Sequence, residues 1–135
     1  MRRALLAALA GLSSVVPAQG APSASLTDPG ASVRGRAIVA DRQLGMCLLC
    51  HRGPFPEEPT QGDLAPDLRG VGKRYTEAQL RQRIVDPLQI NSASIMPSYG
   101  QSKGLWRVAP ALRGRPLLTA EQIEDVVAFL TTLRD

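Results

Sequence analysis

The sequence of 135 residues predicts an all-α fold of short helices joined by long loops. Two capping boxes, each a threonine followed by a glutamine three positions later, mark helix starts at Thr76 and Thr119. No segment shows the sustained alternation of apolar and polar residues that indicates a strand. After the second box, one helical face collects the apolar residues Ile123, Val126, Val127 and Leu130.

Local signals also place the elements in the first half of the chain. A helix is expected over residues 32–45, with Ser32 as a candidate N-cap and Gly45 near its end. Residues 53–66 are rich in Gly and Pro, so we expect a loop there.

The capping box at Thr76 opens a helix that includes residues 80–86. Pro87 closes this helix, because proline has no backbone N–H to continue the hydrogen-bond ladder. Residues 88–118 show no sustained period, and we expect an irregular excursion with one short turn.

Residues 1–20 have the pattern of a secretory signal peptide. Arg2 and Arg3 precede a short apolar run, and small residues follow at a plausible cleavage site. A transmembrane or amphipathic helix is the alternative, but the run is too short to cross a bilayer. We therefore expect export to the periplasm without a membrane anchor. Residues 21–31 would then form a flexible mature N-terminus and residues 32–135 one domain.

The net charge of the chain does not indicate a particular class of partner. The formal net charge is +4, and loss of Arg2 and Arg3 with the signal would lower it to +2. No basic run is interleaved with aromatic residues, so nucleic acid is not an expected partner. The densest positive region, between Arg69 and Arg83, is interpreted as a solvated face in preference to a docking patch.

Both cysteines and the single histidine lie in the stretch M-C-L-L-C-H-R, residues 46–52. A disulfide between Cys47 and Cys50 would close so short a loop that it would constrain almost no chain entropy. A redox-active pair normally follows a strand-then-helix pattern, which is missing before Cys47. Structural zinc requires four Cys or His ligands, and the chain has three such residues.

The remaining interpretation of C-x-x-C-H is covalent attachment of a haem c. Cys47 and Cys50 lie on one turn, where each thiol can bond one vinyl-derived carbon of the porphyrin. The next residue, His51, is then carried under the iron as its proximal ligand. A buried porphyrin would also help to form the core of a domain that contains only two Phe, two Tyr and one Trp.

The sixth ligand of the iron must come from another residue type, such as Lys, Met, Tyr or an amine. A thioether suits the haem iron of electron carriers. Met46 adjoins Cys47 on the proximal side and is not expected to reach the opposite face. Met96 is far enough along the chain to cross over, and Pro97 holds it in an extended conformation. We therefore predict Met96 as the second axial ligand.

Pro66 is predicted to orient the proximal histidine. A ligating imidazole usually donates its other ring N–H to a carbonyl, which fixes the orientation of the ring. The turn A-P-D-L-R-G that follows the loop could present the Pro66 carbonyl to His51, although an ordinary turn proline is the alternative.

Six stretches carry a resemblance to a known family, and the resemblance covers roughly residues 35–133. They are C-L-L-C-H (47–51), P-D-L-R-G-V-G-K-R (66–74), L-R-Q-R-I-V-D (80–86), I-M-P-S-Y (95–99), G-L-W-R-V-A-P-A-L-R-G-R-P-L-L-T (104–119) and E-D-V-V-A-F-L-T-T-L (124–133). They resemble SoxX, the monohaem cytochrome c subunits of the SoxAX complexes of bacterial sulfur oxidation. The stretch G-L-W-R-V-A-P and the C-terminal stretch are more specific than C-x-x-C-H and M-P, which many cytochromes c share.

Two positions depart from the family pattern. Ala65 stands where many class I cytochromes have Gly before the proline, and Ser92 stands where Pro would be expected after Asn91. Both positions concern loop conformation, and neither removes a ligand.

The resemblance implies a class I cytochrome c fold around one covalent haem, with His51 and Met96 as axial ligands. It implies a SoxA-like partner subunit that joins thiosulfate to a cysteine of the carrier protein SoxYZ, the L-cysteine S-thiosulfotransferase reaction. This chain would pass the released electrons to a downstream cytochrome and would hold no catalytic residue. The haem edge beside Cys47 and His51 is the expected contact for electron transfer.

Two other functions stay open at this stage. The chain could be a freestanding soluble cytochrome c that serves an oxidase or another dehydrogenase. It could also be a haem sensor or peroxidase with an exchangeable sixth ligand, which carbon monoxide binding to the reduced protein at neutral pH would indicate.

Overall fold

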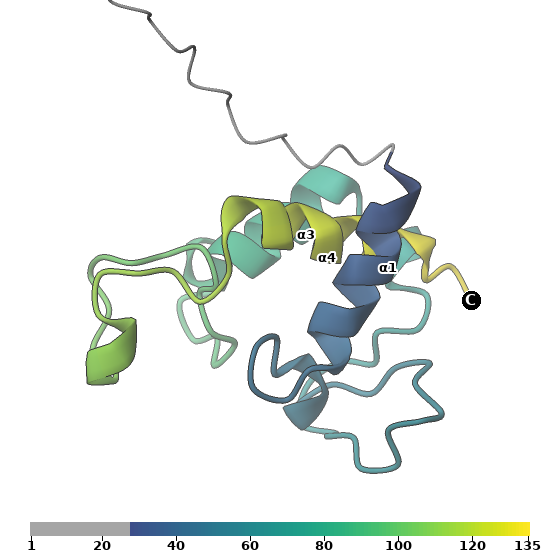
Figure 1. The fold of residues 1–135 in the computed structure, drawn as a ribbon, viewed down its shortest axis with the longest axis horizontal. Helices are drawn as coiled ribbons and strands as arrows, with labels where there is room; N and C mark the ends of the chain where they lie inside the picture. The colour runs from purple at the N-terminus through teal and green to yellow at the C-terminus, as the bar shows by residue number, and fades with distance from the viewer. Residues whose placement is uncertain (1–27) are drawn as a thin grey trace, which may run out of the picture.

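The computed structural model describes residues 28–135, and this range is helical without any β-strand (Figure 1). The prediction of an all-α fold is therefore confirmed. No helix in this range is both long and apolar enough to span a bilayer. In chain order the elements are α1 (Pro29–Ala40), η1 (Cys47–Leu49), α2 (Val71–Arg74), α3 (Glu77–Val85), η2 (Pro87–Gln89), η3 (Pro110–Leu112) and α4 (Ala120–Thr132).

Helices α1 and α4 cross at close range, as Figure 1 shows. The crossing requires Gly35, because a Cβ atom there would clash with the backbone carbonyl of Asp125. Arg34 adds a bidentate ion pair, with Nε 2.8 Å and Nη2 2.7 Å from the two carboxylate oxygens of Asp125. These hydrogen bonds, with a further one from Arg34 to Asp28, raise the pKa of the Arg34 guanidinium above its ordinary value.

Helix α4 forms the centre of the hydrophobic core. The four apolar residues predicted for its inner face, Ile123, Val126, Val127 and Leu130, are buried. Helix α3 packs against α4 through Leu80 and Ile84, and an ion pair between Arg81 and Glu124 closes the edge of this contact at 2.6 Å.

Both predicted capping boxes are present. The side chain of Thr76 accepts from the backbone N–H of Gln79, and the Gln79 side chain accepts from the Thr76 N–H at 2.9 Å. The box at Thr119 repeats this arrangement. Helix α3 ends at Val85, so the predicted stop before Pro87 is also confirmed.

The first helix begins and ends earlier than the sequence predicts. The expected range was 32–45, but the helix covers Pro29–Ala40, and Ser32 lies in its interior. Asp28 is the N-cap, since its side chain accepts from the N–H of Gly30 and the proline that follows has the φ angle of a first helical residue. The helix thus starts inside the segment 21–31 that is expected to be flexible.

The C-terminal limit of this helix and one further element also differ from expectation. Gly45 lies in the turn after α1 and does not end the helix. The short helix α2 was missed; it packs on α4 at Gly72, where a Cβ atom would clash with the carbonyl of Thr131. The excursion 88–118 is irregular, as predicted, with η3 inside it and η2 at its start. The predicted signal peptide lies outside the described residues.

The crossing gives a stability prediction for the haem-loaded protein. Gly35→Ala should lower the free energy of unfolding by about 3 kcal/mol, because the new methyl group has to push α1 away from the α4 backbone. The matched control is Gly30→Ala in the same helix, where the added Cβ meets mainly the end of the flexible Arg34 side chain. Denaturant unfolding measures both values. Equal stabilities of the two variants would contradict the close crossing.

Candidate haem site

The C-x-x-C-H motif forms a single tight turn, which six residues separate from the end of α1. Cys47 O accepts hydrogen bonds from the backbone N–H groups of Cys50 at 3.2 Å and of His51 at 2.9 Å. Met46, the residue before the turn, has a left-handed backbone with φ 56°, which reverses the chain into η1. The motif residues are therefore on one turn, as covalent attachment at two thiols requires.

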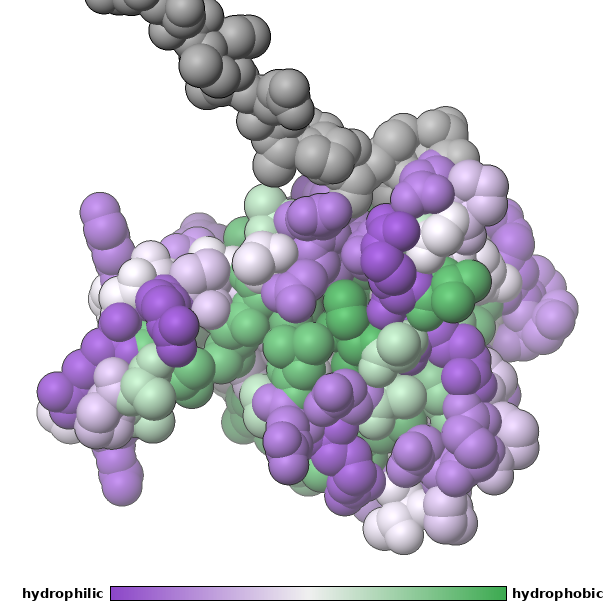
Figure 2. All heavy atoms as spheres, viewed as in Figure 1, coloured by the Kyte–Doolittle hydropathy of each residue, from purple (hydrophilic) through white to green (hydrophobic). Residues whose placement is uncertain are grey.

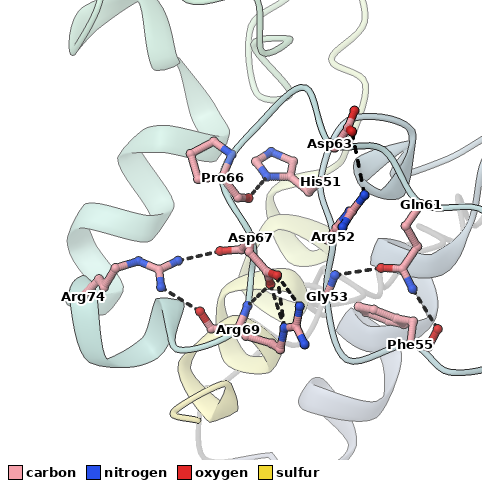
Figure 3. Close-up of polar contacts among 10 residues, drawn as sticks. All are labelled: His51, Arg52, Gly53, Phe55, Gln61, Asp63, Pro66, Asp67, Arg69 and Arg74. Atoms are coloured by element: carbon pink, nitrogen blue, oxygen red, sulfur yellow. Dashed lines mark hydrogen bonds and ion pairs between the residues drawn. The ribbon is translucent and has the colours of Figure 1, made fainter.

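The ring of His51 is held by the carbonyl of Pro66. The distance from Nδ1 to Pro66 O is 2.6 Å, and Figure 3 shows the ring directed at this oxygen. Because the carbonyl can only accept, Nδ1 must carry the proton, which leaves the lone pair of Nε2 free for a metal.

Two backbone hydrogen bonds hold the Pro66 segment alongside the motif. The N–H of Ala65 donates to Cys50 O at 2.9 Å, and the N–H of Leu68 donates to Arg52 O at 2.8 Å. These bonds flank the contact between His51 and Pro66 on both sides. The alanine at position 65, a departure from the family pattern, is accommodated in this arrangement.

The Gly- and Pro-rich loop is organised by one side chain that the sequence analysis missed. Gln61 accepts from the N–H of Gly53 at 2.8 Å and donates to Phe55 O at 2.8 Å (Figure 3). It also donates to Glu58 O at 2.9 Å. Phe55 is buried beside Phe129 of α4, so the loop is anchored in the core. A single glutamine in a polar loop gives no sequence signal for this role.

Polar contacts also hold the turn after Pro66. Arg74 of α2 donates to the carbonyls of Asp67 and Arg69, each at 2.6 Å, as Figure 3 shows. The side chain of Asp67 accepts from Arg69, and this lowers the pKa of the Asp67 carboxyl below its ordinary value. These contacts brace the segment that presents Pro66 to the histidine.

The segment that carries Met96 is joined to the motif through Tyr99. The buried Tyr99 hydroxyl donates to Gly45 O at 2.5 Å, two residues before Cys47. The backbone of Tyr99 is paired with Ile84 at the end of α3 and with Leu118 before α4. Met96 is half-buried and packs against the core. The sequence analysis did not identify Tyr99, because its partner is 54 residues away in the chain.

The environment of the thiols does not suit a redox-active pair. Burial raises the pKa of the Cys47 thiol to about 11, whereas catalytic C-x-x-C thiols have a lowered pKa. Cys47 and Cys50 are not joined in a disulfide. Within residues 28–135, no three Cys, His, Asp or Glu side chains form a cluster that could hold a metal ion. A structural zinc site is thus excluded for this range.

The residues present fit a covalently bound haem. Two thiols on one turn would supply the attachment points of a c-type haem, an imidazole with a free Nε2 would supply one iron ligand, and the half-buried thioether of Met96 is the candidate for the second. A band of hydrophobic side chains crosses the middle of the face seen in Figure 2. Several large apolar side chains near these donors in the chain are exposed, among them Leu49, Leu64 and Ile95. A haem attached at the C-x-x-C-H turn would cover part of this exposed apolar surface.

Both thiols lie on one turn, where each can bond the haem. We therefore predict that the haem of the unaltered protein is covalently attached and cannot be extracted. The colour should stay with the polypeptide after denaturation and acid–organic extraction, because two thioether bonds survive both treatments. Cys47→Ala and Cys50→Ala should each retain the haem through the other thiol. The double variant should release it, and absorbance of the two phases measures the result. Free extraction from the unaltered protein would contradict covalent attachment.

Comparison with known proteins agrees with this site. A family model described as cytochrome c matches residues 32–134. The chain is also similar to a crystal structure of SoxXA from P. pantotrophus, with 36% sequence identity and a TM-score of 0.73. The match covers 81% of this chain and 85% of that chain. No match was found among curated protein sequences.

These findings confirm the resemblance to SoxX and the cytochrome c fold, and with them the binding of haem c. The fold places the C-x-x-C-H turn after α1 and places α4 against α1. The chain belongs to the cytochrome c family.

Proposed function

We propose that this chain is the electron-transfer subunit of a periplasmic SoxAX-type complex, an L-cysteine S-thiosulfotransferase of thiosulfate oxidation. The observation that carries the proposal is the similarity to SoxXA at 36% identity over 81% of the chain. The single C-x-x-C-H motif supports a monohaem protein, because both cysteines are used in it. The signal-like pattern of residues 1–20 supports the periplasmic location.

In this proposal His51 and Met96 are the axial ligands. The hydrogen bond to Pro66 holds the His51 ring in one orientation and keeps the proton on Nδ1. Tyr99 fixes the backbone three residues after Met96 against the segment that leads into Cys47. A bound haem would supply a one-electron iron couple, and His51 and Met96 would hold its iron.

The chain itself would carry no catalytic residue for sulfur transfer. Attack on a sulfur species requires a thiolate, and both cysteines of the chain would be engaged in thioether bonds after maturation. The only histidine would be an axial ligand and therefore would not act as a general base. A SoxA-like partner subunit would therefore join thiosulfate to the cysteine of a carrier protein. This chain would accept the electrons released, through the haem edge beside Cys47 and His51, and pass them to a downstream acceptor.

The identity of the sixth ligand can be tested by exchanging the two candidate methionines. Met96→Ala should open the sixth position and let carbon monoxide bind to the reduced protein. It should also lower the reduction potential by more than about 60 mV, a tenfold change for a one-electron couple, because a thioether favours ferrous iron.

Met46→Ala is the matched control and should leave the spectrum and the potential unchanged. Spectroelectrochemistry measures both variants. If Met46→Ala changes the potential and Met96→Ala does not, the ligand is the other methionine.

The role in thiosulfate oxidation is tested by reconstitution. The isolated haem-loaded chain should be readily reduced and oxidised but should join no thiosulfate to the carrier cysteine. Activity should appear when a SoxA-like subunit is added, and mass spectrometry of the carrier protein detects the product. Sulfur transfer by this chain alone would refute the assignment. Redox activity without any stable complex would favour a freestanding electron carrier.

A further inference from the structure

Residues 102–117 form a protruding segment, here called the Trp106 arm, that contains none of the residues of the haem site described above. Figure 1 shows it extending away from α1, with η3 at its far end. Trp106 is 86% exposed, and Leu105 and Leu112 are also exposed. A tryptophan with this exposure is unusual on a monomer surface, because its large ring is normally well buried.

The Trp106 arm is a concentrated positive surface. It contains four basic residues and no Asp or Glu. Within residues 28–135, none of the four is in an ion pair with another side chain. Several other cations of the described range, such as Arg34, Arg69 and Arg81, are paired with carboxylates. The four residues are Lys103, Arg107, Arg113 and Arg115.

The arm is built as a unit attached to the core at its two ends. In the described part of the chain, its hydrogen bonds stay within the arm, for example Leu112 N–H to Ala109 O at 2.9 Å. At the ends, Leu118 is buried and its N–H donates to Tyr99 O, and Gln101 donates to Asp86. The base of the arm therefore adjoins the segment that carries Met96.

The backbone of the Trp106 arm has an unusual conformation at Arg107, the residue after the tryptophan. Arg107 has φ 57°, a left-handed conformation that costs a non-glycine residue free energy. Gly104 and Gly114 supply two more left-handed positions on either side. Such conformations persist where a segment has a particular shape to maintain, and they are found preferentially at functional sites.

We propose that the Trp106 arm is the docking surface for the redox partner subunit, and that this partner presents an acidic surface around an apolar pocket for Trp106. The inference rests on the proposed function, since it names the surface through which that complex forms. Tryptophan and arginine are the residues most enriched at the energetic centres of protein interfaces. The unpaired cations are complementary to a negative surface and would steer the encounter. The partner would thus be held next to the Met96 side of the site.

The experiment measures binding of the haem-loaded chain to the purified SoxA-like subunit, at two salt concentrations. Trp106→Ala should weaken binding by about tenfold or more, and Trp106→Phe should restore part of the loss. Val33→Ala on α1 is the apolar control, because Val33 is 71% exposed.

A second pair of variants tests the charges. Lys103→Gln with Arg113→Gln should weaken binding at low salt, and the difference should shrink at high salt. The control is Lys73→Gln with Arg134→Gln, which removes the same charge from two exposed residues outside the arm. This control should bind like the unaltered chain.

The outcomes separate the inference from the proposed function. If the unaltered chain does not bind the subunit, the proposed function fails. If it binds and the arm variants bind equally well, the docking surface lies elsewhere and the inference fails. A changed haem spectrum or reduction potential in Trp106→Ala would show that the ring covers the haem, which also overturns the inference. The inference also fails if Trp106→Ala no longer binds anionic lipid vesicles but still binds the subunit as tightly as the unaltered chain.

Discussion

The close crossing of α1 and α4 is the constraint on which the rest of the structure depends. Gly35 lets the two backbones approach, and the bidentate pair of Arg34 with Asp125 fixes their angle. Because only six residues separate the end of α1 from Cys47, its direction determines where the attachment turn starts. Helices α2 and α3 both pack on α4, so the crossing also positions the segments that reach Pro66 and Met96.

The candidate haem site draws on three segments of the chain, and hydrogen bonds to backbone carbonyls join them. Pro66 O contacts His51, and Gly45 O accepts from Tyr99. In both cases a backbone carbonyl accepts a hydrogen bond from an aromatic side chain, His51 or Tyr99. The ring is thus held in place by a partner that carries no charge. A ligating imidazole that donates its other N–H to a carbonyl is held in one orientation, and the contact of His51 with Pro66 O has this form.

The proposed function and the inferred docking surface assign different tasks to two parts of the chain's surface. The haem edge near Cys47 would transfer electrons, while the Trp106 arm would select the partner through apolar contact and charge. Separate surfaces suit an electron carrier, because one surface can supply binding affinity while the other lets the haem edge transfer electrons. The buried apolar contacts of α4 have no part in either task and serve stability.

The sequence alone determined the features that depend on neighbouring residues. The capping boxes at Thr76 and Thr119, the apolar face of α4 and the C-x-x-C-H turn are local patterns with local causes, and the structure has each of them. The start of α1 was missed because the pattern was sought at Ser32, whereas the cap at Asp28 depends on the proline after it. Only the tertiary structure decided what joins distant segments: the role of Gly35, the reach of Tyr99 and the exposure of Trp106. Such contacts arise from chain packing, where a residue's partner is set by the arrangement of helices and leaves no periodic signal in the sequence.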